Sequence, residues 1–136
     1  MLFDRLIGRF QAADRTTRLE ALLDHSRKLP DLPERLQASR DADIHRVAEC
    51  QTPVFLWAER EGDRVHFFAD VPRESPTVRG YVSLLVRTMD GATPAEIAAV
   101  PDDLLERLRL TDTLGMMRTQ GLTAILARVK RLAAAS

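Results

Sequence analysis

Apolar residues recur every three to four positions through the first thirty residues, which is the spacing of one face of an α-helix. The face is formed by Leu19, Leu22, Leu23 and Ser26. The run Thr17-Arg18-Leu19-Glu20 has the form of a capping box, so we expect the helix to begin there and to end at Pro30. Pro33 then predicts a short helical turn with Leu36 facing inward.

The pattern changes to that of strands in the next forty residues. A polar stretch runs through Asp43, and residues 54–58 and 65–69 are rich in β-branched and aromatic side chains. Because Glu61-Gly62-Asp63 is a turn signal between them, we expect an antiparallel hairpin. Residues 44–47 are predicted to add a third strand.

The remaining half of the chain has the pattern of helices. Ser75 and Pro76 predict a helix start, and Gly91 closes the apolar stripe of Val78, Val82, Leu85 and Met89. The run Thr93-Pro94-Ala95-Glu96 predicts a second capped helix, which carries Ile97 and Val100 and ends before Pro101. Residues 102–108 predict a short helix, and a last helix presents Leu122, Ile125, Leu126 and Val129.

These elements predict the fold class and the domain organisation. Because the strands cluster instead of alternating with helices, we expect an α+β fold in which an antiparallel sheet of about three strands has helices packed on one face. A chain of 136 residues fits a single domain over residues 1–136. The first residues, to about residue 12, are expected to form a loose helical extension.

The composition limits the classes of partner that we expect for this protein and indicates its cellular compartment. Lys and Arg number 20, and Asp and Glu also number 20, so no net positive field exists to hold nucleic acid. The first ten residues contain Asp4, Arg5 and Arg9, which is unlike a secretory signal, and no segment reaches membrane-spanning length. We therefore expect no nucleic-acid or membrane partner, and a cytoplasmic protein whose single cysteine stays a free thiol.

That cysteine, Cys50, is the strongest candidate for chemistry. It follows Ala48 and Glu49 and precedes Gln51, Thr52 and Pro53, between the expected third strand and the hairpin. A lone thiol is either an inert small hydrophobe or a nucleophile that needs a second molecule. A loop position predicts that a partner can reach the sulfur, and so favours reactivity over burial.

Other catalytic motifs are missing from the sequence. It has no glycine-rich phosphate loop and no Gly-x-Ser-x-Gly elbow, and His25, His45 and His66 do not have the spacing of metal ligands. His45 precedes Cys50 by five residues, so it is a candidate base for a cysteine hydrolase. A surface or strand-end role for this histidine is favoured, and no metal site is expected.

Several short motifs, in this order, resemble the SufE family of sulfur-acceptor proteins. They lie between residues 18 and 132: Leu29-Pro30, Cys50-Gln51-Thr52, Ser75-Pro76-Thr77-Val78-Arg79-Gly80, Thr93-Pro94-Ala95-Glu96-Ile97 and Met117-Arg118-Thr119-Gln120-Gly121-Leu122. The resemblance implies that Cys50 takes persulfide sulfur from a pyridoxal-phosphate (PLP) dependent cysteine desulfurase, stimulates that enzyme and passes sulfur to iron–sulfur scaffold proteins. The resemblance further implies that this protein is a sulfur-transfer partner of the desulfurase, which has no cofactor of its own and does not turn over a substrate alone. It also implies a monomer or a weak homodimer.

The resemblance also implies roles for residues around the thiol. Gln51 and Thr52 are expected to support the cysteine loop, and Arg118 to contact the desulfurase or anchor that loop, with a helix-start salt bridge as the alternative. Asp70 is a further candidate for loop support, with an ordinary turn aspartate as its alternative.

The sequence departs from the family immediately before the cysteine. Glu49 stands where the family usually has glycine, and a carboxylate beside the sulfur is expected to disfavour the thiolate. Met116, Met117 and Trp57 are interpreted as core residues. The alternative function is a non-catalytic adaptor that binds a desulfurase or related partner without sulfur transfer, with a cysteine hydrolase as a third hypothesis.

Overall fold

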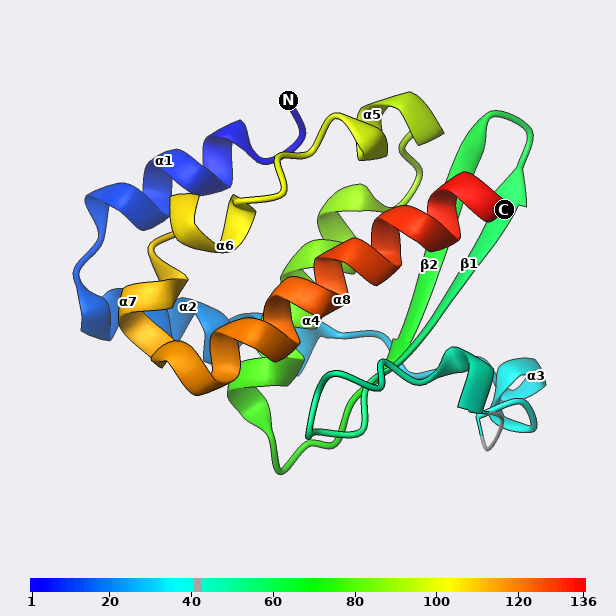
Figure 1. The fold of residues 1–136 in the computed structure, drawn as a ribbon, viewed down its shortest axis with the longest axis horizontal. Helices are drawn as coiled ribbons and strands as arrows, with labels where there is room; N and C mark the ends of the chain where they lie inside the picture. The colour runs from blue at the N-terminus through cyan, green and yellow to red at the C-terminus, as the bar shows by residue number, and fades with distance from the viewer. Residues whose placement is uncertain (41–42) are drawn as a thin grey trace.

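The computed structural model describes residues 1–40 and 43–136, so part of the polar stretch before residue 44 lies outside the described residues. The elements in chain order are α1 (Asp4–Ala12), α2 (Arg15–Lys28), α3 (Glu34–Gln37), the 3₁₀ turn η1 (Asp43–His45), β1 (Phe55–Glu61), β2 (Arg64–Asp70), α4 (Pro76–Met89), α5 (Pro94–Ala98), α6 (Leu104–Arg107), α7 (Leu110–Leu114) and α8 (Met116–Ala135). The α+β class is confirmed (Figure 1).

The sheet is a two-stranded antiparallel hairpin of β1 and β2. Its strands meet at Gly62, whose φ of +61° suits a glycine in a tight turn. The expected third strand is not formed among the described residues: 43–45 make a 3₁₀ turn, and Arg46 contributes one isolated bridge to Phe55. One bridge holds this segment beside β1 without extending the sheet.

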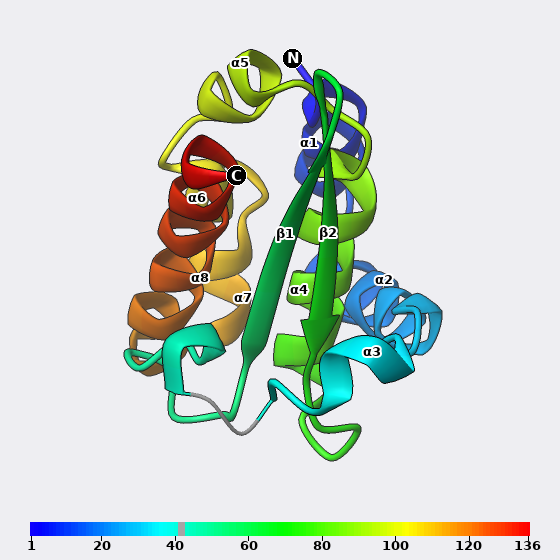
Figure 2. The same ribbon diagram turned by 90° about the vertical axis from the view of Figure 1, so that its right-hand side faces the viewer.

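Helices α4 and α8 lie behind one face of the hairpin (Figure 2). The residues on that face include the cross-strand pair Leu56 and Ala69, together with Phe67 and Val65, all of which are buried. The alternation of buried and exposed positions along β2 follows directly from the two-residue period of a strand. This layer forms the centre of the core.

Residues of α3 and η1 contact the other face of the hairpin near one end of the strands (Figure 2). The His45 ring stacks on Trp57 with ring centroids 4.9 Å apart, and the Trp57 indole N–H donates to the Ser39 hydroxyl at 3.1 Å. The Arg35 guanidinium lies 5.3 Å from the centre of the Phe68 ring. Packing is therefore two-sided, with long helices on one face and a short polar segment on the other.

Helix α4 is buried along almost its whole length, since β2 and α8 contact it and α2 packs closely against it. Gly80 makes this approach possible, since a Cβ there would lie 2.1 Å from the Leu22 carbonyl oxygen. Ser75 occupies the expected N-cap position of α4, with Pro76 first in the helix, but its side chain makes no capping hydrogen bond. The start of α4 is thus set by proline and by packing.

The N-terminal segment is a packed part of the fold. Helix α1 places Phe10 in the core, and Phe3, the residue immediately before α1, is fully buried. Helix α2 begins earlier than expected: Asp14 is its N-cap and accepts from the Thr17 amide at 2.8 Å, so the predicted Thr17 capping box is wrong. The helix begins at the earlier cap because the Asp14 carboxylate, three residues before Thr17, accepts the hydrogen bond of the Thr17 amide.

The C-terminal helices follow the sequence prediction except at one junction. The capping box of Thr93 and Glu96 is present in α5. Arg109, with a φ of +59°, is the N-cap of α7, a helix that the sequence did not predict, and it separates α7 from the end of α6. Gly115, with a φ of +81°, then separates α7 from α8. No helix in the described ranges has the length and apolar character to span a bilayer.

Candidate functional site

The cysteine loop, residues 48–53, is closed at its base by backbone hydrogen bonds. The Val47 amide donates to the Val54 carbonyl at 2.9 Å, and the Cys50 amide donates back to the Val47 carbonyl at 3.2 Å. Val47 and Val54 are fully buried, so both ends of the loop are fixed in the core. The loop is thus a short, anchored excursion that carries the thiol at its centre.

Cys50 is buried, with 6% of its surface exposed, because α8 packs against it. The closest part of α8 is Gly121, where a Cβ would lie 3.3 Å from both the Sγ and the Cα of Cys50. The expectation that a loop position leaves the sulfur exposed is therefore wrong for this structure. The loop is at the surface, but its cysteine points inward.

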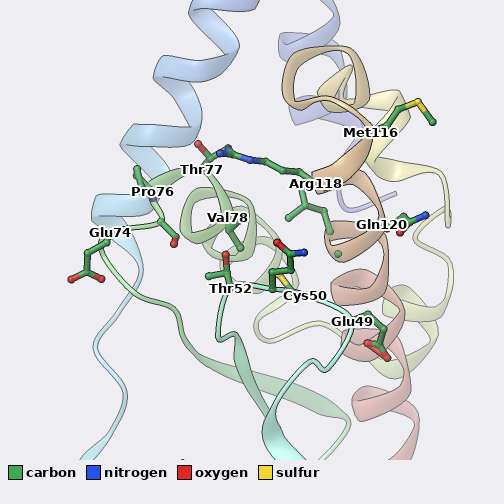
Figure 3. Close-up of a pocket in the computed structure, with 14 residues that line it drawn as sticks. Glu49, Cys50, Thr52, Glu74, Pro76, Thr77, Val78, Met116, Arg118 and Gln120 are labelled. Carbon is green, nitrogen blue, oxygen red and sulfur yellow. The ribbon is translucent and has the colours of Figure 1, made fainter.

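The inward-pointing thiol lines a pocket of about 570 Å³. Three segments form its walls: the cysteine loop, the segment from Glu74 into the start of α4 at Val78, and the start of α8 with Arg118 and Leu122 (Figure 3). These segments are far apart in the sequence, and the fold brings them together at one end of the two long helices. The pocket gives a route from solvent toward a sulfur that is otherwise covered.

Burial raises the pKa of the Cys50 thiol, because an ionised sulfur loses its hydration there. The amide and hydroxyl of Thr52 and the positive charge of Arg46 oppose this rise. Glu49 is exposed and its carboxylate points away from the sulfur (Figure 3). The rise in the pKa of the thiol is therefore caused by burial, and not by the adjacent carboxylate as the sequence suggested.

Arg118 extends from the first turn of α8 across the pocket toward Thr77 (Figure 3). Its side chain is exposed, and within the described residues it makes no ion pair. The alternative of a helix-start salt bridge is therefore not realised in this part of the chain. The geometry presents a guanidinium at the pocket mouth.

The other predicted site residues divide into two groups. Gln51 and Thr52 line the pocket beside Cys50, with Gln51 exposed and Thr52 half-buried. Asp70 lies elsewhere: it ends β2 and forms an ion pair with Arg40. The structure brings the loop residues together with Arg118 and does not bring Asp70 to the loop.

The histidines do not assemble a second site. His45 packs on Trp57, away from the residues that line the pocket, and His66 contacts Asp90 at 3.3 Å. Across the described chain no group of three potential ligands could hold a metal ion. Without a base beside the thiol, this geometry gives no support to the cysteine hydrolase hypothesis.

The sequence prediction gave no role in the site to two residues that line the pocket, and it placed a third in the core. Gly121 and Glu74 both line it, and Met116, interpreted as core, lies at its edge with 88% of its surface exposed. Trp57 is buried as expected, and the Met117 side chain lies outside what the structure describes. The sequence did contain one signal for Gly121, since a glycine inside a helical pattern often marks a close packing contact.

Comparison with known proteins identifies the family to which this chain is similar. The model of the SufE family, described as an Fe-S metabolism associated domain, matches residues 4–133. A SufE-like protein of Mycobacterium tuberculosis is 35% identical over 127 residues, which is 93% of this chain and 87% of the relative. The sulfur acceptor protein CsdE of Escherichia coli K12 is 35% identical over 101 residues, 73% of this chain and 65% of that protein.

A solved structure shares the whole fold. The solution structure of a protein from Thermus thermophilus superposes with a TM-score of 0.81 at 29% identity, and the match covers 99% of this chain and 97% of the other. With a family model spanning nearly every residue, this chain belongs to the SufE family. Membership agrees with the motif order found in the sequence.

Proposed function

We propose that the chain is a sulfur acceptor, which takes persulfide sulfur onto Cys50 from a PLP-dependent cysteine desulfurase and passes it to iron–sulfur cluster assembly. The single observation that carries this proposal is the placement of the only cysteine, on an anchored loop, at the wall of an open pocket. Family membership and the name of the CsdE relative support it.

The transfer is a thiol exchange. The Cys50 thiolate attacks the outer sulfur of a persulfide on the desulfurase, the sulfur–sulfur bond of that persulfide breaks, and the desulfurase cysteine leaves as a thiolate. Cys50 then carries the outer sulfur as its own persulfide. No external oxidant is needed, because one sulfur–sulfur bond forms as another breaks, and the proton of Cys50 passes to solvent or to the leaving thiolate.

Docking has to change the environment of Cys50 before this attack. The resting thiol is buried and mostly protonated at neutral pH, and α8 closes one side of it. The partner therefore has to draw the cysteine loop outward or supply a positive charge that stabilises the thiolate. Either effect would stimulate the desulfurase, because the acceptor removes the enzyme's persulfide and frees it for another turnover.

The residues around the pocket supply the surface for this docking. Arg118, exposed at the pocket mouth, is suited to contact a carboxylate or a backbone carbonyl of the desulfurase. The amide and hydroxyl of Thr52 lower the pKa of Cys50, which supports a role for Thr52 in stabilising the thiolate. Gln51 is exposed beside the sulfur and is proposed to support the loop in the docked state.

The test is the rate of cysteine turnover by a desulfurase with and without this protein. The wild-type chain should increase turnover, and Cys50→Ser should abolish the increase while still binding the desulfurase in a pull-down. Arg118→Ala should weaken stimulation, and Arg131→Ala, an exposed arginine of the same helix outside the pocket, is the matched control. Full stimulation by Cys50→Ser would reject the proposal.

The alternative is an adaptor that binds the desulfurase without accepting sulfur, and the burial of Cys50 is the observation that favours it. In that case Cys50→Ser behaves as wild type in both binding and turnover. The same two assays therefore separate an acceptor from an adaptor, since only an acceptor loses stimulation while it keeps binding.

A further inference from the structure

Gly121 occupies the sixth position of α8, directly against the cysteine loop. A Cβ at this position would lie 3.3 Å from the Cα of Cys50, 3.3 Å from its Sγ and 3.5 Å from its Cβ. The two distances of 3.3 Å are tighter than nine in ten of the contacts that real Cβ atoms make. Gly8, which is also inside a helix, has no atom within 4 Å of the same point.

Rotation of the cysteine side chain cannot relieve this contact. The Cα of Cys50 is as close as the sulfur, so a methyl group on residue 121 presses on the backbone of the loop. The helix cannot easily retreat, because Leu122 and Ile125 behind it are buried in the core. The loop can give, since Ala48, Glu49 and Gln51 on its outer side are exposed.

We propose that Gly121 is a positioning residue that sets how deeply Cys50 is seated, and thereby sets the reactivity of the resting thiol. Alanine is favoured over glycine inside a helix, so the fold forgoes helix stability at this point. What it gains is space for the cysteine against the backbone of α8. The consequence of Gly121 for sulfur transfer rests on the proposed function, but the effect of Gly121 on the reactivity of the Cys50 thiol does not.

The environment of the sulfur supports this inference. Burial is the largest cause of the raised pKa of Cys50, so outward movement of the loop should lower that pKa and increase the thiolate fraction. The base of the loop stays fixed by the hydrogen bond between Val47 and Val54. A small substitution at residue 121 should therefore tilt the loop without unfolding it.

The experiment measures the alkylation rate of Cys50 by iodoacetamide in the full chain, without any desulfurase. Gly121→Ala should react faster than wild type, on the order of threefold to tenfold, because the sheltered state is destabilised. Gly8→Ala makes the same chemical change in a helix with open space around it, and should react at the wild-type rate. Far-UV circular dichroism and urea unfolding check that each variant is folded.

Two comparisons make the outcome decisive. Gly121→Leu should react faster still, since a larger side chain keeps the loop further out, and Gly121→Ala decides the matter if the leucine variant does not fold. A folded Gly121→Ala that alkylates at the wild-type rate overturns the inference. If alkylation accelerates but wild-type Cys50 never receives sulfur, the proposed function fails while the role of Gly121 stands.

Discussion

The close packing of α2 on α4 predicts that one added methyl group will destabilise the fold. In Gly80→Ala, the new Cβ would lie 2.1 Å from the Leu22 carbonyl oxygen, whereas ordinary contact begins at 3.4 Å. The obstructing atom belongs to the backbone of α2, so no side-chain rotation can relieve it. The two helices must therefore separate by more than 1 Å.

The expected cost follows from two opposing effects. Overpacking a rigid helix contact costs about 3 kcal/mol, and replacing a helical glycine with alanine returns about 1 kcal/mol. The net loss in the free energy of unfolding is then about 2 kcal/mol. Because α4 also forms one wall of the pocket around Cys50, the same variant should change the alkylation rate of that thiol.

Urea unfolding monitored by circular dichroism measures this loss, with Gly8→Ala as the matched control. Gly8 lies in α1 with open space around its missing side chain, so alanine there should stabilise the chain by about 0.5–1 kcal/mol. The same substitution thus has opposite signs at the two positions. If Gly80→Ala were as stable as wild type, the close contact between α2 and α4 would be refuted.

Three further predictions concern the thiol and a helix cap. Glu49→Gln should leave the alkylation rate of Cys50 within about twofold of wild type, because burial and not this exposed carboxylate raises the pKa of the thiol; a tenfold change would restore Glu49 as the cause. The raised pKa of Cys50 means that the folded chain keeps the thiol proton to higher pH than the unfolded chain, so its alkylation rate should keep rising with pH after that of the urea-unfolded chain has levelled off. For the same reason the free energy of unfolding should fall as pH rises through the raised pKa. Identical pH profiles of alkylation for the folded and unfolded chains would contradict the burial of Cys50. Thr93→Ala should lower the free energy of unfolding by about 1 kcal/mol through loss of the capping box with Glu96, and an unchanged urea midpoint would show that the cap contributes nothing.

Local signals in the sequence predicted most of the elements. The hairpin, the helix from Pro76 and the capped helix from Thr93 each depend on residues within a few positions of one another, and all three are present. Where two local signals competed, the prediction failed: Asp14 and Thr17 are both good N-caps, and only the structure shows which one meets the first amides. Helix α7 was missed because it depends on Arg109 adopting a left-handed conformation.

The sequence singled out the candidate residue but not its surroundings. A lone thiol in a loop made Cys50 the candidate for chemistry, and the resemblance to the SufE family implied what that chemistry is. The sequence could not place Gly121 against that thiol, since the two residues are 71 positions apart and meet only through the packing of α8. Exposure of Cys50 was misjudged for the same reason: the loop is local, but what covers its cysteine is not.

Mass spectrometry shows whether Cys50 carries sulfur. The chain is incubated with a cysteine desulfurase and cysteine, and intact mass and peptide mapping are recorded before and after a thiol reductant is added. We expect the mass of one added sulfur atom, located on Cys50 and removed by the reductant. If a desulfurase binds the chain and turns over cysteine while Cys50 gains no sulfur, even before reductant is added, Cys50 is not a sulfur acceptor.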